Sequence, residues 1–389
     1  MISLPSQRQL ILPLLEALED EGGSATTGIL KERIADGLGL DIEATQRRGK
    51  IGGQDHNLLA HRVRWAQQHA RIAGLVERGE RRWSLSDRGR EHLTKSVPGR
   101  PVTVFFTEHG CAIWGLAEEA ASLIDAGSVR LLLSSPPYPL NTRKKYGNEA
   151  AEEYVDWLCR IIETLMPAMA GDGSLVINLG DVWTKNSPTV SLYQERTVIA
   201  LHDRLGLNLC QRFVWHNPST LPVPTNYVGR ERIRVKNAYE TLWWLSPSER
   251  PYADNRSILE PYSPAMRKLI DKGGVGRSIK PSGHAHREGS FSVDNGGAIA
   301  PNVIRLPNSG DQAYTAACRE AGLRPHPARM PRELASRMIR FLSRPGELVL
   351  DPFGGSGTTA LAAEELGRKW ITTEMHREYI EGARFRFAA

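Results

Sequence analysis

An α/β fold with an open sheet is predicted from two stretches of the sequence. In the first, the apolar run 131–133 ends abruptly at residues 134–138, which comprise two serines, two prolines and a tyrosine. This run is too short to cross a membrane and has the character of a buried parallel strand. In the second, an apolar segment at 347–351 leads into a glycine-rich turn, followed by a helix at 360–366 and a short strand at 369–373. Strands that alternate with helices in this way are typical of α/β folds.

The residues after the first strand are candidates for a binding site. Open α/β sheets bind ligands at the carboxyl ends of their strands, which is where Ser135, Pro136, Pro137 and Tyr138 lie. The prolines remove two backbone donors and fix φ, so neighbouring carbonyl groups are held in place and left free to accept hydrogen bonds. A hydroxyl, a rigid carbonyl and an aromatic face suit a flat base that bears an exocyclic amine. Taken alone, however, these four residues favour a proline-stiffened turn after a core strand.

The second stretch indicates a nucleoside cofactor. The glycines at 354, 355 and 357 let the backbone approach a ligand, and the helix that follows offers free N–H groups. The strand after that helix ends at Glu374, where nucleotide-binding α/β folds hold ribose hydroxyls. The turn lacks the Lys-Ser/Thr ending of a phosphate-binding loop, and its glycine spacing is not the dinucleotide fingerprint. The order strand, turn, helix, strand and acid therefore favours a nucleoside ligand.

Further elements are expected between and around these stretches. The patterns predict strands at 102–106 and 174–179, and helices at 113–124, 154–169 and 333–342. Asn178 and Asp181 end one of these strands and either support a ligand or cap the next turn. From about 213 to 323 the alternation breaks down, and such a long insert is expected to have a function of its own. Trp243 and Trp244 lie in an apolar run within it and are expected in the core.

Residues 1–95 are predicted to form a separate helical module of the winged-helix type, joined through a linker at 96–101 to a domain spanning 102–389. Helices are expected at 7–18, 26–34 and 56–76, with a hairpin at 77–85. Residues 44–95 hold twelve Lys/Arg against five Asp/Glu, which favours contact with DNA phosphates. The alternatives are a solvated basic face or a docking surface. The module resembles, more weakly, the amino-terminal module of Mrr-type restriction proteins.

Composition sets broad limits on the class of protein. The 389 residues carry a net charge of +6 and are 40% hydrophobic, as expected for a globular protein with an anionic partner. The four cysteines are isolated, which predicts a reduced, cytoplasmic protein without disulfide or zinc, and no metal site is expected. No apolar run approaches the length of a membrane span, so no membrane association is expected.

The two site stretches together resemble those of a known family, the β group of the amino-directed DNA methyltransferases. Residues 135–138 resemble the catalytic motif and 351–359 the cofactor motif, in the order found in that group. The resemblance runs from about residue 102 to the carboxyl terminus and is greatest to the PvuII-type methyltransferases, notably at 232–236, 243–244, 294–297 and 326–329. It implies a Rossmann-like sheet that binds S-adenosylmethionine. It also implies the following roles: catalytic Ser135, Pro136, Pro137 and Tyr138, and cofactor-binding Asp351, Phe353, Gly354, Gly355, Ser356, Gly357, Thr358 and Glu374.

The resemblance also implies a reaction. Serine at the first motif position is typical of the enzymes that methylate cytosine N4, whereas adenine N6 enzymes of this group more often carry Asp or Asn. The methyl group would pass directly to an amine of a flipped base, held by Ser135 and the Pro136 carbonyl and stacked on Tyr138. Methylation at cytosine C5 needs a cysteine nucleophile that usually follows a proline, and no cysteine of this chain does. Three alternatives stay open: adenine N6 methylation, a non-catalytic DNA-binding protein, and a methyltransferase acting on RNA or protein glutamine.

Basic residues near the expected site are candidates for DNA binding. Within the insert at about 213–323, which the resemblance identifies as the target-recognition region, they are Arg230, Arg232, Arg234 and Lys236. Arg143, Lys144 and Lys145 follow the proline loop and either hold phosphates or belong to an ordinary surface loop. The expected partner is a short site in double-stranded DNA, with a cognate restriction endonuclease as a second candidate partner. Both a monomer and a homodimer are compatible with the sequence.

Overall fold

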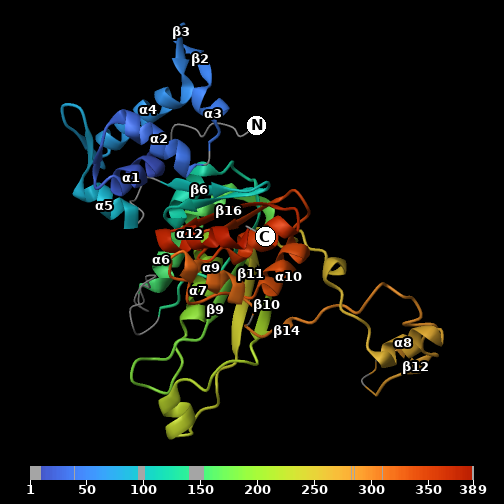
Figure 1. The fold of residues 1–389 in the computed structure, drawn as a ribbon. Coiled ribbons are helices and arrows are strands. Elements are labelled where there is room, and N and C mark those ends of the chain that lie inside the picture. The colour runs from blue at the N-terminus through green and yellow to red at the C-terminus, as the bar shows by residue number, and fades with distance from the viewer. Residues whose placement is uncertain are drawn as a thin grey trace.

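The computed structural model describes residues 10–387 apart from 39, 95–100, 140–152, 282, 284 and 309 (Figure 1). One large mixed sheet with helices on both faces forms the body, and a helical module packs against it. In the described residues the sheet has nine strands, in the spatial order β14 (Val303–Arg305), β10 (Asn208–His216), β11 (Tyr239–Ser246), β9 (Met169–Gly180), β8 (Val129–Ser134), β15 (Leu348–Asp351), β16 (Lys369–Glu374), β7 (Gly110–Trp114) and β6 (Val102–Phe106).

The centre of this sheet is parallel. Strands β9, β8, β15, β16 and β7 run in one direction, and Leu132 of β8 pairs with Leu175 on one side and Leu350 on the other. Strand β11 is antiparallel to β9 and β10, and β6 is antiparallel to β7. The carboxyl ends of β8, β9, β15 and β16 therefore share one edge of the sheet with the amino end of β11. Ligands bind at this edge in open α/β sheets.

Side chains of β8 alternate between two apolar clusters on opposite faces of the sheet. Leu131 and Leu133 belong to the cluster that contains α10 (Arg332–Leu342), α11 (Thr358–Glu365) and α12 (Arg377–Ala383). Leu132 belongs to the cluster that contains α6 (Tyr154–Leu165) and α7 (Tyr193–Leu205). All three leucines are completely buried, as predicted for a strand covered on both faces. The expected strands at 102–106 and 174–179 and the helices at 154–169, 333–342 and 360–366 are present, with shifted ends.

The helix expected at 113–124 is only partly present. Ile113 and Trp114 end β7, where they pair with Thr373 and Glu374 of β16, and only a 3₁₀ helix, η2 (Ala117–Leu123), follows. Ala112, Ile113 and Trp114 are all buried, so the end of this strand is a continuous apolar run rather than an alternating pattern. A continuous run does not distinguish a strand from a helix, which explains the error.

The insert at 213–323 is less irregular than expected. The end of β10 at 213–216, the whole of β11 and the short β14 extend the main sheet. Trp243 and Trp244 are buried in β11, as predicted, and their indole N–H groups donate to Gln194 Oε1 at 3.1 Å and Ser174 Oγ at 2.9 Å. The insert also holds two helices, two short strands and two helical turns: α8 (Pro264–Asp271), α9 (Gln312–Glu320), β12 (Ser278–Ile279), β13 (Ala285–His286), η4 (Asn226–Arg230) and η5 (Asn255–Ile258). Two further helical turns lie outside the insert, η3 (Met166–Ala168) and η6 (Arg384–Arg386).

Two segments of the insert project from the body in Figure 1. The first, the 217–238 lobe, connects β10 to β11 and holds η4. The second, the 261–297 arm, holds α8, β12 and β13, whereas η5 precedes it on the body, where Ser257 Oγ donates to the Arg340 carbonyl of α10 at 2.8 Å. No residue of α8 is buried, although the helix carries a distinct apolar face. These projections, not the sheet strands between them, are the part of the insert that a doubly wound sheet does not require.

The amino-terminal module combines helices with a small antiparallel sheet. Its helices are α1 (Ile11–Asp20), α2 (Thr27–Gly37), α3 (Ile42–Gln46), α4 (Leu58–Ile72) and α5 (Asp87–Thr94), and its sheet has the order β1 (Ser24–Ala25), β5 (Trp83–Leu85) and β4 (Val76–Arg78). The three expected helices and the hairpin are therefore present. A second hairpin, β2 (Arg48–Ile51) with β3 (Gln54–Asn57), was not predicted. Its signal was the Gly52-Gly53 pair, whose φ angles of 59° and 84° suit a tight hairpin turn.

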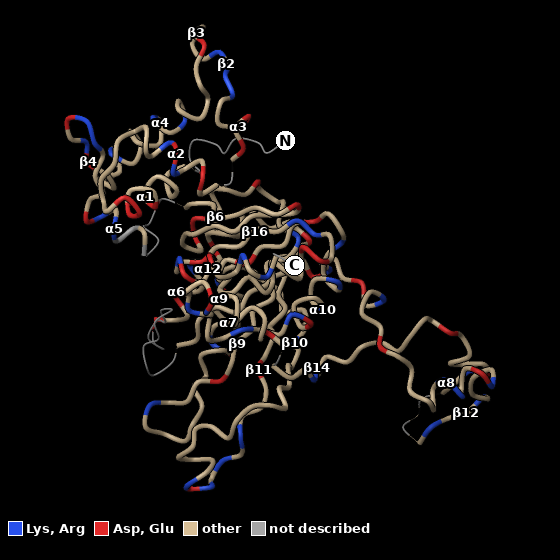
Figure 2. Tube along the Cα trace, viewed as in Figure 1, with Lys and Arg blue, Asp and Glu red and all other residues tan. Residues whose placement is uncertain are grey.

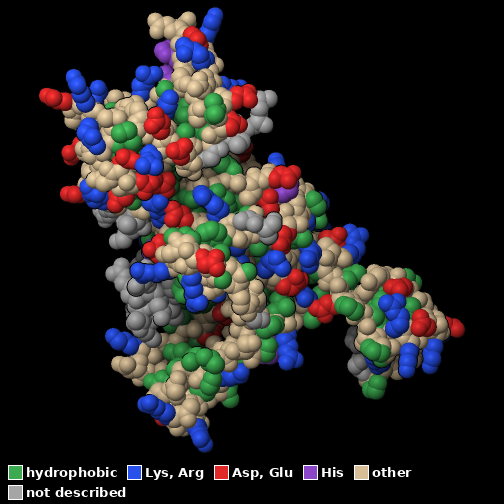
Figure 3. All heavy atoms as spheres, viewed as in Figure 1, with side chains coloured by type: hydrophobic (Ala, Val, Ile, Leu, Met, Phe, Trp, Pro, Cys, Tyr) green, Lys and Arg blue, Asp and Glu red, His purple; other side chains and the backbone are tan. Residues whose placement is uncertain are grey.

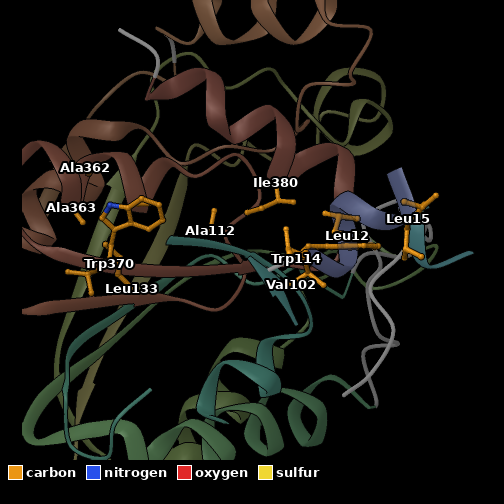
Figure 4. Packing of buried hydrophobic residues seen from close by; sticks show 14 of the residues in the cluster. Leu12, Leu15, Val102, Ala112, Trp114, Leu133, Ala362, Ala363, Trp370 and Ile380 are labelled. Carbon is orange, nitrogen blue, oxygen red and sulfur yellow. The ribbon is translucent and has the colours of Figure 1, made fainter. Parts of the chain in front are cut away.

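This module shares an apolar core with the large sheet. Leu12 and Leu15 of α1 lie beside Val102, Trp114 and Ile380 in one cluster (Figure 4). At the same contact Arg377 of α12 pairs with Glu16 of α1 and donates to the carbonyl of Leu93 at 3.2 Å. The predicted linker at 96–101 lies outside the described residues except for Pro101. In the part of the chain that the structure describes, no helix combines the length and the apolar character that a membrane crossing needs.

Candidate active site

A cavity of about 490 Å³ opens at the carboxyl ends of β8, β15 and β16. It brings together the two stretches that are far apart in the sequence. The predicted residues that line it are Ser135, Pro136, Pro137, Tyr138, Asp351, Phe353, Gly354, Gly355, Ser356, Thr358 and Glu374. Gly357 does not line the cavity, because it is the N-cap of α11 with a left-handed φ of 73°. This backbone conformation favours glycine, and the expected contact of Gly357 with the ligand stays a prediction.

Asp351 joins the two stretches. Ser134, the last residue of β8, donates from its hydroxyl to Asp351 Oδ1 at 2.5 Å, and the Phe353 amide donates to the same oxygen at 3.1 Å. Burial raises the pKa of the Asp351 carboxyl above its ordinary value, although these hydrogen bonds oppose the shift. The carboxylate thus fixes the start of the glycine turn to the strand that leads into the proline loop.

Glu374 closes the glycine turn from the other side. Its Oε2 accepts from the Gly355 amide at 3.0 Å, and its Oε1 accepts from the His376 amide at 2.8 Å. Burial raises the pKa of this carboxyl to about 7, and the backbone hydrogen bonds only partly oppose that effect. Each oxygen retains a lone pair that can accept a further hydroxyl from a ligand.

The glycine turn packs closely against residues of neighbouring segments. A Cβ atom on Gly354 would lie 1.9 Å from Thr372 Oγ1, and one on Gly355 would lie 3.2 Å from Nε2 of His326. His326 also lines the cavity, and burial lowers its pKa to about 4, so the imidazole is neutral at neutral pH. A side chain at Gly354 or Gly355 would therefore displace either the turn or these neighbouring residues.

A polar network lies on the opposite wall of the cavity. Tyr138 donates from its hydroxyl to Glu240 Oε2 at 2.8 Å, and Asn178 Nδ2 donates to the same oxygen at 2.6 Å. Ser135 Oγ lies 3.4 Å from the Tyr138 hydroxyl. The Tyr138 ring packs on Gly180, where a Cβ would lie 2.7 Å from the ring. The proline loop is thus held against β9 and β11.

Glu240 was not among the predicted site residues. It begins the apolar run of β11, and the antiparallel pairing of Glu240 with Gly180 brings it to the carboxyl edge of the parallel strands. Sequence alone does not show that pairing. Asn178, weighed as a ligand or a cap, lines the cavity. Asp181 does not, since it accepts from the side-chain amides of Gln194 and Asn237 at 2.8 and 3.1 Å.

The predicted DNA-binding residues lie outside the cavity. Arg230, Arg232, Arg234 and Lys236 are exposed on the 217–238 lobe, where Figure 2 shows basic segments, and Figure 3 shows a hollow between this lobe and the body. Arg234 Nε donates to the Pro188 carbonyl at 2.7 Å, which ties the lobe to a neighbouring loop. The predicted Arg143, Lys144 and Lys145 lie outside the described residues. Among the described residues, no cluster of three or more metal-binding side chains occurs.

Comparison with known proteins decides the family. The family model described as DNA methylase, for N6 and N4 methyltransferases, matches residues 129–385. The chain belongs to this DNA methylase family. A second model, the Mrr N-terminal domain, matches residues 8–95 of the methylase, which is the helical module.

Individual relatives agree with this assignment. The methylase is 41% identical to type II methyltransferase M.PvuII of Proteus hauseri over 286 residues, or 73% of this chain and 85% of that protein. It is 28% identical to the DNA adenine methyltransferase YhdJ of Escherichia coli strain K12 over 283 residues, or 72% and 83% of the two chains. Among solved structures, the PvuII DNA methyltransferase (cytosine-N4-specific) matches with a TM-score of 0.59 and 34% identity, covering 73% of this chain and 88% of that one. A Rossmann-like methyltransferase sheet is thereby confirmed.

Proposed function

We propose that this DNA methylase transfers the methyl group of S-adenosylmethionine to the N4 amine of cytosine in a short site of double-stranded DNA. The observation that carries the proposal is that Ser135 and the glycine turn open on the same cavity. The 41% identity to M.PvuII and the structural match to a cytosine-N4-specific enzyme support cytosine over adenine. The type II designation of that relative supports a place beside a restriction endonuclease.

The residues of the glycine turn fit S-adenosylmethionine. Gly354 and Gly355 line the cavity without side chains of their own, Glu374 offers carboxylate oxygens for ribose hydroxyls, and Phe353 gives an apolar wall. When bound, this cofactor supplies an electrophilic methyl carbon on a sulfonium sulfur. The cavity volume of about 490 Å³ lies within the range of small-molecule sites.

The proline loop is suited to hold the acceptor base. Ser135 Oγ and the rigid Pro136 carbonyl would accept the two amine protons, which directs the nitrogen lone pair toward the methyl carbon. Tyr138, fixed by Glu240 and Gly180, would hold the flipped base by stacking, because the amine is inaccessible inside a duplex. Holding both reactants in one geometry supplies a large part of the rate acceleration.

DNA contact is proposed for two surfaces. The 217–238 lobe exposes Arg230, Arg232, Arg234 and Lys236 and serves as part of the target-recognition region. The amino-terminal module is proposed to be a winged helix, supported by its helices and its sheet order β1-β5-β4. In that arrangement the exposed Arg64 and Arg71 of α4 would face phosphates.

One experiment tests the reaction and both surfaces. DNA incubated with the purified protein and tritiated S-adenosylmethionine is digested to nucleosides, and we expect label in N4-methylcytosine. Ser135→Ala is expected to reduce this label at least about 100-fold, because it removes an acceptor of a hydrogen bond from the amine.

Changing Arg64 and Arg71 together to Gln, or Arg230 and Arg232 together to Gln, is expected to weaken DNA binding and to leave the identity of the methylated base unchanged. Label in N6-methyladenine, or no label, would refute the proposal, and arginine variants that bind DNA normally would refute the corresponding surface.

The raised pKa of Glu374 predicts a pH-dependent cofactor affinity. In the unliganded protein, a pKa raised from 4.5 to about 7 favours the protonated carboxyl, so its contribution to stability falls as the pH rises through about 7. Ribose hydroxyls donate to the ionised form, so binding releases a proton below that pH. We expect the affinity for S-adenosylhomocysteine to rise by up to about tenfold per pH unit between pH 5.5 and 7 and then level off. Calorimetric titration measures this change, and Glu374→Gln is expected to bind weakly without the pH dependence; equal affinity of the wild type at all these pH values would contradict the assignment.

A further inference from the structure

Glu240 is a carboxylate in the cavity wall without a basic partner. It stands at the start of β11, and its Oε2 accepts two hydrogen bonds, from Tyr138 and Asn178. No arginine, lysine or histidine in the described residues forms an ion pair with it. The titratable groups that face it are Tyr138 from the proline loop, Tyr193 from α7 and Asp181 after β9. A buried carboxylate without a basic partner lowers the stability of the fold, so its presence in the cavity wall points to a function.

The hydrogen bonds around Glu240 lead back to Ser135. Tyr138 Oη lies 2.8 Å from Glu240 Oε2 and 3.4 Å from Ser135 Oγ. The path Ser135, Tyr138, Glu240 therefore runs from the residue expected at the amine to a carboxylate. Asn178 Nδ2 lies within 3.4 Å of all three, at 3.4 Å from Ser135, 3.1 Å from Tyr138 and 2.6 Å from Glu240, and holds the path together.

This network contains one hydrogen-bond acceptor that is not used. Asn178 is 1% exposed, and its Oδ1 is a buried acceptor without a donor among the described residues. Buried acceptors are rarely left without a partner. If Glu240 received a proton, a half-turn of the Asn178 amide would bring Oδ1 to the new donor. The network can thus accommodate either the ionised or the protonated form of Glu240.

The proposed reaction must release one proton. The nitrogen lone pair forms the new N–C bond, the C–S bond breaks, and its electron pair stays on sulfur as a neutral thioether. The nitrogen then carries a positive charge until one of its two original protons leaves. A serine hydroxyl is too weak a base to keep that proton. Burial raises the pKa of the Glu240 carboxyl above its ordinary value, although the bonds from Tyr138 and Asn178 oppose this, so it holds a proton better than an exposed carboxylate.

We propose that Glu240 accepts the proton released by the methylated amine, relayed through the hydroxyls of Ser135 and Tyr138. The inference rests on the proposed methyl transfer to an exocyclic amine. Because Glu240 acts through Tyr138, it is a positioning and proton-accepting residue rather than one that touches the reacting atoms. Asn178 keeps Tyr138 and Glu240 in hydrogen-bonding distance.

The test compares Glu240→Gln with the wild type over a range of pH. Glutamine keeps an oxygen that accepts from Tyr138 and Asn178 but does not take up a proton. We expect kcat for transfer of tritiated methyl to DNA to fall about 100-fold, with the KM for cofactor changed less than about twofold. The wild-type kcat should fall on the acid side as Glu240 becomes protonated, and this limb should disappear in Glu240→Gln. Tyr138→Phe, which keeps the ring and removes the relay hydroxyl, should show the same loss.

Asp181→Asn is the matched control, because it removes another partly buried carboxylate at the same sheet edge that does not contact Tyr138. It should keep kcat and the acid limb, with the limb moved to slightly lower pH because the charge of Asp181 raises the pKa of Glu240. Calorimetric cofactor binding confirms that each variant is folded. An active wild type with an equally active Glu240→Gln, or a Glu240→Gln that keeps the acid limb, overturns the relay alone. A wild type that transfers no methyl group overturns the proposed function and the relay with it.

Discussion

Gly354→Ala is expected to abolish detectable cofactor binding. The methyl group would have to occupy space 1.9 Å from Thr372 Oγ1 and 3.2 Å from the carbonyl oxygen of Thr373. Thr372 has little freedom to withdraw, because its hydroxyl donates to the Asp351 carbonyl at 3.0 Å. The Gly354 amide in turn donates to Thr373 at 2.8 Å, so the turn and β16 are bonded at the point of collision. Relief of the clash must therefore displace the turn from the end of β16.

The size of the effect follows from that displacement. Overpacking of a well-packed site costs about 1–3 kcal/mol or more. Displacing the turn would also break the bond from the Gly355 amide to Glu374, and with it the geometry of the carboxylate expected to hold the ribose. We expect affinity for S-adenosylmethionine in calorimetric titration to weaken by at least about 100-fold, with loss of methyl transfer.

Gly171→Ala is the control for Gly354→Ala. Gly171 lies in β9 of the same sheet, and a Cβ there would meet no atom within 4 Å. We expect this variant to bind cofactor and transfer methyl groups like the wild type. Tight cofactor binding by Gly354→Ala would mean that the glycine turn does not form the cofactor site.

The sequence could predict those site residues whose position depends only on the elements next to them in the chain. Ser135 to Tyr138 and the turn at 352–357 each follow an apolar strand, so their position at the sheet edge could be deduced without knowing the strand order. Glu240 could not be deduced in this way. Its position depends on the antiparallel pairing with β9, which brings together residues distant in the sequence. The surroundings of Gly357 illustrate the same limit, since a Cβ there would lie 3.0 Å from the Cβ of Ala383 in α12, a neighbour that local sequence does not reveal.

Errors in the fold prediction have a related cause. The last two residues of β7 were assigned to a helix because a continuous apolar run lacks the alternation that marks a half-buried strand. The extent of the insert was overestimated because β10 and β11 are linked by a long, polar lobe that conceals a simple antiparallel pair. In both cases tertiary packing supplies information that a local window of residues lacks.

Arg386→Ala is expected to destabilise the protein by about 3 kcal/mol and to weaken cofactor binding. Arg386 is 9% exposed and forms a bidentate ion pair with Asp311, with both N···O distances at 2.8 Å. Its Nε donates to the Ser356 carbonyl at 2.6 Å, inside the glycine turn. Removing one partner of a buried pair typically costs about 3–5 kcal/mol. The lower end applies because Asp311 is partly exposed and lies 3.4 Å from Arg329, which remains as a second partner.

Urea unfolding and its pH dependence measure this loss. Burial alone would raise the pKa of Asp311, but the hydrogen bonds and charge of Arg386, with Arg329, lower it below the ordinary value of 3.8. A depressed pKa contributes stability above that ordinary value, and the contribution is lost as the pH falls through the folded-state pKa. The difference between wild type and Arg386→Ala should therefore be full at pH 7 and shrink below about pH 4.

Arg384→Ala provides the comparison two residues away. Arg384 is exposed and lies over Phe105, and among the described residues its hydrogen bond goes to the Val104 carbonyl at 3.0 Å, so its removal should cost less than about 1 kcal/mol. Equal losses in the two variants would show that the carboxyl-terminal segment as a whole, rather than the Arg386–Asp311 pair, stabilises the fold. If Arg386→Ala were destabilised but bound the cofactor normally, Arg386 would stabilise the carboxyl-terminal segment without determining the shape of the glycine turn. Because Arg386 bonds directly to Ser356, we expect affinity and stability to fall together.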